Sequence, residues 1–174
     1  MIMSDIAFAH LDVEVPSLRR PRAFDTIVYG GLTAGVMDIS YAIIFFGIRN
    51  GAKPTRVLQS VASGLLGRDA ARAGGMKTAL LGLALHFLNA LIIATVFFSA
   101  SLILRTLIRH AVICGLLYGV AVYFVMNYIV IPLSAIGPRT GPAPWAVFLS
   151  GLIVHAFLIG LPIALFAKRS ARTS

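Results

Sequence analysis

Charged residues are scarce in this sequence. Asp, Glu, Lys and Arg make up 12% of the 174 residues, hydrophobic residues make up 59%, and the mean hydropathy is +0.91. An average soluble domain carries about 25% charged residues. This scarcity excludes an ordinary soluble domain and indicates an integral membrane protein. Because one crossing takes about 20 residues, we expect only a few spans, within a single membrane domain covering residues 1–174.

Cysteine is almost absent as well. Cys114 is the single cysteine, so no intrachain disulfide can form. Its only neighbour with suitable chemistry is His110, and no third group orients the pair. Ser99 and Ser150 lie in no nucleophile motif. We therefore expect a protein that is not an enzyme.

Long apolar runs are what the sequence has in place of charge. Four of them are long enough to cross a bilayer, at about 27–48, 78–104, 111–131 and 145–166. Their polarity does not alternate as in the strands of a β-barrel, so helices are the remaining way to satisfy the backbone inside a membrane. We predict an all-α integral membrane protein built as a four-transmembrane-helix bundle.

The connection between the first and second runs is the only long one, and it predicts a short helix over about 54–66. Pro54 suits the first helical position, and Gly67 can end the helix. One side of this helix is apolar: Val57, Leu58, Val61, Ala62, Leu65 and Leu66. The other side is polar: Arg56, Gln59, Ser60 and Ser63. We expect an amphipathic helix in the membrane interface, with a lid over the mouth of the bundle as the alternative.

The segment 1–24 is expected to be a tail, not a signal peptide, because Asp5, Asp12 and Glu14 interrupt it. Of the 15 basic residues, eight lie on the side of the termini and seven on the other side. The connection "PLSAIGPRTGPAPW" has the composition of an exterior loop, whereas the "RTLIRH" turn and the C-terminal "AKRSARTS" suit the cytoplasm. We predict that both termini are cytoplasmic.

The net charge of +9 has consequences for partners. Basic residues at the edges of the apolar runs predict binding to anionic lipid headgroups. A homo-oligomer or a complex with a partner membrane protein stays open. Nucleic acid is not expected as a partner, because the sequence contains no soluble basic domain.

Strongly polar residues are few within the runs: Asp38, His86, Asn89, Asn127 and His155. Consecutive helices are antiparallel, so depth is counted from the side of the first and third connections. At 1.5 Å per residue, Asp38 lies at roughly 15 Å, His86 at 12 Å, Asn127 at 6 Å and His155 at 15 Å. These four depths fall in the same leaflet.

Small residues share the helix faces of these polar residues. Gly31, Gly35 and Asp38 follow the spacing i, i+4, i+7, and Gly115 and Gly119 repeat it on the third run. Glycine at this spacing lets membrane helices pack closely. Gly82 and Gly151 likewise precede His86 and His155 by four residues. The polar side chains are therefore expected to point into the bundle.

Burying a lone charge at the bilayer centre costs on the order of 3 kcal/mol, so Asp38 needs a partner, water or a proton. We expect it to contact His155 or His86. Three hypotheses follow: a network that holds the helices together, a proton-linked or polar-substrate pathway, and a metal or haem site on the two histidines. No ligand motif supports the third, so we expect no cofactor. We take a transport-like or proton-linked role as the working hypothesis and a structural or accessory subunit as its alternative.

Three of the apolar runs are similar to a known protein family, and this similarity implies a cellular location. The glycine-rich first run, "GLLYGVAVYFVMNYIVIPLSAIGP" in the third and "SGLIVHAFLIGLPIALFAKR" in the fourth are similar to the YagU-like group of small, functionally unassigned bacterial inner-membrane proteins. The similarity covers the last two runs and follows the first two in outline. It implies a bacterial inner-membrane location. It carries no assigned reaction and no catalytic residues.

Overall fold

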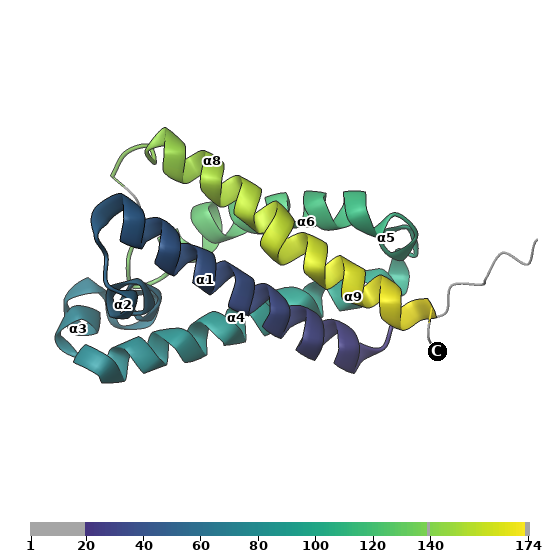
Figure 1. Ribbon diagram of the computed structural model, residues 1–174, viewed down its shortest axis with the longest axis horizontal. Coiled ribbons are helices and arrows are strands. Elements are labelled where there is room, and N and C mark those ends of the chain that lie inside the picture. The colour runs from purple at the N-terminus through teal and green to yellow at the C-terminus, as the bar shows by residue number, and fades with distance from the viewer. Residues whose placement is uncertain (1–19, 139, 173–174) are drawn as a thin grey trace, which may run out of the picture.

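The computed structural model describes residues 20–138 and 140–172, and these residues form helices and connections without a β-strand. Figure 1 shows their arrangement. Four helices are long and apolar enough to cross a membrane: Asp25–Asn50, Gly75–Ile103, Ala111–Leu133 and Trp145–Arg172. The prediction of an all-helical chain with four spans of this kind is confirmed. Most of the expected tail lies outside the described residues.

Three of the four long helices contain a π-helical segment. The first consists of η1 (Asp25–Gly30) and α1 (Gly31–Asn50), and the second is α4 (Gly75–Ile103). The third consists of α6 (Ala111–Val125), η2 (Met126–Val130) and α7 (Ile131–Leu133). The fourth consists of α8 (Trp145–Val154), η3 (His155–Gly160) and α9 (Leu161–Arg172). π-Helical turns are rare and often occur at functional sites.

The fourth helix is longer than the sequence predicted. Hydropathy places its end near residue 166, but the helix continues to Arg172. Ala167, Ser170 and Ala171 are buried. Basic residues beside these three lower the average hydropathy, so the average does not show that one face of the helix is buried. The small size of the three residues lets the last turns pack against the bundle.

Short helices close the two ends of the bundle. α2 (Pro54–Leu66) and α3 (Arg68–Ala73) lie at one end, and α5 (Thr106–Arg109) lies at the other, next to the end of α9. The two ends of the described chain meet at the α5 end (Figure 1), where the Arg22 N–H donates to Ser170 Oγ at 3.1 Å. We call the two ends the loop end, with α2 and α3, and the terminal end.

The helix α2 forms at the predicted place, but its faces are used differently. Val57 and Ala62 of the apolar side are buried as expected, but Gln59 and Ser63 of the polar side are buried too, and Leu65 is 61% exposed. α2 crosses α4 so closely that a Cβ on Gly82 would lie 1.9 Å from the Leu58 carbonyl oxygen. Small and hydrogen-bonding side chains therefore face α4, and Gln59 Nε2 donates to the Gly75 carbonyl at 2.8 Å.

Glycine sets the closest helix crossings. On α1, Gly31 and Gly35 face α4, where an added Cβ on Gly35 would lie 2.9 Å from the Phe87 ring. On α6, Gly119 faces the fourth helix, and its Cβ would lie 2.0 Å from the His155 carbonyl oxygen. Gly115 occupies the same interface one turn earlier, where its Cβ would lie 2.9 Å from the Gly160 carbonyl oxygen. These contacts leave no space for larger residues.

The apolar core lies toward the terminal end, where α4, α5, α6 and α9 meet. Phe97 and Ile163 are fully buried there, and Tyr118 packs edge-on against Phe97 with 5.1 Å between ring centroids. The Tyr118 hydroxyl donates to the Ile93 carbonyl at 2.7 Å. The other buried residues of this apolar core are mostly small: Ala34, Ala94, Ile108, Ala111, Ile159, Ala164, Ala167 and Ala171.

Candidate functional site

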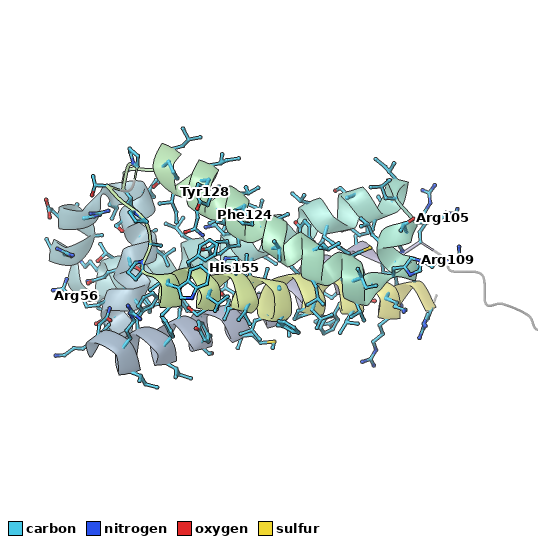
Figure 2. All side chains as sticks on the ribbon, turned by 90° about the horizontal axis from the view of Figure 1, so that it is seen from above. Arg56, Arg105, Arg109, Phe124, Tyr128 and His155 are labelled. Carbon is cyan, nitrogen blue, oxygen red and sulfur yellow. The ribbon has the colours of Figure 1, made fainter. Side chains whose placement is uncertain are left out.

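Four of the five predicted polar residues line a single cavity of about 130 Å³. Asp38 reaches it from α1, His86 and Asn89 from α4, and His155 from the start of η3. Figure 2 shows His155 between the end that carries Arg56 and the end that carries Arg105 and Arg109. The remaining lining residues are apolar or small: Ala34, Gly35, Val61, Ala90, Ile93, Met126 and Ile159. We call this space the polar cavity.

Asp38 is the chemically unusual member. Within residues 20–138 and 140–172 it forms no hydrogen bond and no ion pair. Every fully buried side-chain nitrogen or oxygen in those ranges has a hydrogen-bond partner. The Asp38 oxygens are therefore not sealed inside protein. They open into the polar cavity, which at about 30 Å³ per molecule has room for a few waters.

His86 has one ring nitrogen occupied. Its Nε2 lies 2.9 Å from the Gly35 carbonyl oxygen, across the contact between α4 and α1. Because a carbonyl only accepts, Nε2 must carry the proton. The other ring nitrogen, Nδ1, has no partner among the described residues. The helices are thus linked at the level of the polar cavity, and one nitrogen stays available for water or a ligand.

His155 is held in a similar way by its own helix. Its Nδ1 lies 2.9 Å from the Gly151 carbonyl oxygen, so Nδ1 donates and Nε2 is left without a described partner. An electrostatic interaction connects His155 with Asp38. No ion pair within 4.0 Å joins Asp38 to either imidazole in the part of the chain that the structure describes. In place of the direct pair expected from the sequence, these side chains share a cavity.

Asn127 is the predicted site residue that lies elsewhere. Its side-chain amide donates to the Tyr123 carbonyl at 3.0 Å within its own helix. It lines a second cavity, of about 500 Å³, and its neighbour Met126 lines the polar cavity. The helix changes to π geometry at Met126, which alters the direction in which the following side chains point. Regular helical spacing does not predict that change.

The described side chains do not converge as a metal site. No group of three or more His, Cys, Asp or Glu residues in these ranges is arranged to hold a metal ion. Cys114 is not among the residues that line the polar cavity, and its thiol donates weakly to the Thr106 carbonyl at 3.7 Å. The Ser150 hydroxyl donates to the Val147 carbonyl at 3.3 Å, in its own helix.

No protein-family model, curated protein or solved structure matches this chain. The fold and the cavity together define a class: a bundle whose four long helices could cross a membrane, with an ionisable side chain that lines a cavity between the helices. What the chain does has to be inferred from that cavity.

Proposed function

We propose that this protein is a multi-pass membrane protein with a transport-like or proton-linked role, in which Asp38 carries a proton or a small cation. The observation that supports this most is that the Asp38 carboxylate lines the polar cavity without a hydrogen bond or ion pair to any described residue. A carboxylate placed only to brace a bundle would be expected to accept hydrogen bonds from its neighbours. Intramembrane ionisable residues that face water-filled cavities commonly mark ion or proton pathways.

The histidines suit the role of a relay. Each uses one nitrogen for a backbone carbonyl and keeps the other without a described protein partner. A neutral imidazole of this kind accepts a proton on its second nitrogen and can release it to water or to a carboxylate. Waters in the polar cavity would connect Asp38 with His155 and His86. The chemistry needs no bound cofactor.

Membrane insertion explains the outer surface. Each of the four long helices exposes large apolar side chains, for example Ile44, Leu80, Leu117 and Phe157. Many exposed large apolar side chains are costly in water and favourable in lipid. Leu65 and Leu66 on α2 point away from the bundle and would enter the membrane interface. Basic residues at both ends would contact anionic headgroups.

The proposed location is the bacterial inner membrane with both termini in the cytoplasm, as the loop compositions and the YagU-like resemblance predict. Figure 2 places Arg56 at one end of the bundle and Arg105 and Arg109 at the other. Both ends are basic, which is why sequence charge hardly distinguishes them. A homo-oligomer or a complex with another membrane protein is compatible with this arrangement.

A structural or accessory role is the second candidate. The hydrogen bond from His86 to the Gly35 carbonyl links α4 to α1, and the glycine crossings hold the helices closely together. In that case the polar cavity would be a by-product of helix packing. Removing the charge of Asp38 would then have no effect on any flux.

Proteoliposomes with an internal pH-sensitive dye and an imposed potassium diffusion potential test the proposal. Wild-type protein should acidify the lumen faster than protein-free liposomes. Asp38→Asn keeps the size and hydrogen bonding of the side chain, so it should fold normally and reduce the rate to the protein-free level. Asp69→Asn makes the same change on exposed α3 and should keep the wild-type rate. Equal rates for wild type and Asp38→Asn would contradict the proposal.

A further inference from the structure

The larger cavity lies at the loop end, next to the polar cavity. It is formed by the end of the third long helix, by the connection that follows and by the start of the fourth helix. That connection is fixed to α2, because the Ala135 N–H donates to the Gly64 carbonyl at 2.9 Å. At about 500 Å³ it is several times larger than the polar cavity, and Tyr128 at its border is strongly exposed. We call this space the vestibule.

The lining of the vestibule meets the lining of the polar cavity at Tyr123 and His155. Tyr123 lines the vestibule, and its ring lies edge-on against the imidazole of His155, with 5.3 Å between centroids. His155 itself lines the polar cavity. One aromatic contact therefore connects the wall of one space with the wall of the other.

The fit of Tyr123 is specific. Tyr123 is only 5% exposed, and the centroids of the Tyr123 and Phe148 rings are 5.7 Å apart. A Cβ on Gly151 would lie 2.7 Å from Tyr123 Cε2, so the glycine makes room for the ring. Both helices that hold the contact change to π geometry at this level, at Met126 and at His155. Such segments often mark functional sites.

We infer that the vestibule is the route by which water and protons reach Asp38, and that Tyr123 is the side chain that closes this route. The inference rests on the proposed function for its purpose, but the access route can be tested separately. Displacement of the Tyr123 ring would join the two cavities. The polar cavity would then connect with the loop end, while the apolar core fills the space toward the terminal end.

Cysteine accessibility measures this directly. In a Cys114→Ser background, Asn89→Cys places a thiol in the polar cavity, and a charged, membrane-impermeant methanethiosulfonate reagent is added to either side of sealed vesicles. We expect labelling from the loop-end side only. Tyr123→Ala should increase its rate several-fold, because it removes the ring that separates the cavities. Tyr123→Phe keeps the ring and should leave the rate near that of the Asn89→Cys parent.

Two controls keep the result interpretable. Val36→Cys lies on α1 and is exposed on the outside of the bundle, so it should resist the charged reagent with and without Tyr123→Ala. Asp38→Cys gives a second thiol in the polar cavity in case Asn89→Cys fails to fold. Labelling from the terminal-end side, or a rate that Tyr123→Ala leaves unchanged, would overturn the inference. Failure of the proposed function would appear instead as unchanged flux in Asp38→Asn.

Discussion

The two halves of the bundle use the same helices in different ways. Toward the terminal end, Phe97, Ile163 and small residues fill the space between helices, and the buried polar side chains there, such as Thr26 and Ser170, are hydroxyls that bond to backbone. Toward the loop end, Asp38, His86 and His155 surround a cavity. Ile93 marks the border, since its side chain lines the polar cavity and its carbonyl accepts from Tyr118 on the core side. The terminal half is filled by side chains, whereas ionisable side chains surround a cavity in the loop half.

The largest effect is expected where the fourth helix crosses the third. A Cβ at Gly160 would lie 2.0 Å from the Gly115 carbonyl oxygen, and backbone cannot move away without separating the helices. Gly160→Ala should therefore cost about 3 kcal/mol. A decrease of roughly 6–12 °C in the melting temperature in detergent would correspond to that cost.

A matched control distinguishes this crossing from helix propensity. Gly47 is also a helical glycine, but its added Cβ would meet only the Ala52 carbonyl oxygen, at 3.7 Å. Gly47→Ala should leave the melting temperature unchanged or raise it slightly. Equal losses for both substitutions would mean that close packing does not set the stability of the terminal half.

A smaller effect is expected from the loss of a single interhelical hydrogen bond, and one such bond can be removed in the terminal half and one in the loop half. Tyr118→Phe removes the bond to the Ile93 carbonyl beside the core, and His86→Leu removes the bond to the Gly35 carbonyl beside the polar cavity. Bonds of this kind contribute about 0.6 kcal/mol on average and up to roughly 1.7 kcal/mol. Tyr118→Phe should fall near the upper value. His86→Leu should cost less, because cavity water can bond the freed carbonyl.

Melting temperatures of the two variants in the same detergent provide the measurement. Addition of Tyr118→Phe to His86→Leu should give the sum of the two losses, since the bonds do not share a partner. A larger loss for His86→Leu than for Tyr118→Phe would mean that the polar cavity is as dry as the core.

Hydropathy predicted the four long helices because apolar runs of spanning length leave the backbone no other solution. Counting depth along antiparallel helices put Asp38, His86 and His155 at similar levels, and the structure has them around one cavity. Asn127, counted nearer the loop end at roughly 6 Å, lines the vestibule instead. The π-helical turn that begins at Met126 is a further departure that a regular period of 3.6 residues does not predict.

Sequence reasoning did not predict which side chains of α2 face α4, or that α9 continues to Arg172, for a related reason. Gln59 looks like a surface residue by polarity, yet it faces α4 because the Gly75 carbonyl gives it a partner. Ala167 and Ala171 lie among basic residues, yet both are buried, because their small size lets the end of α9 pack against the core. The place of Tyr123 near the side of Gly115 and Gly119 follows from the sequence, but its contact with His155 does not. In each case a tertiary contact decides the orientation, and hydropathy cannot register it.

The central claim is that the cavity beside Asp38 contains water and the core beside Phe97 does not. A crystal structure at a resolution that shows ordered waters tests this most directly. We predict water density within hydrogen-bonding distance of the Asp38 carboxylate, extending toward His155 Nε2 and His86 Nδ1, with none between Phe97 and Ile163. A cavity without water, with the Asp38 carboxylate bonded directly to an imidazole, would contradict the account and favour the structural role.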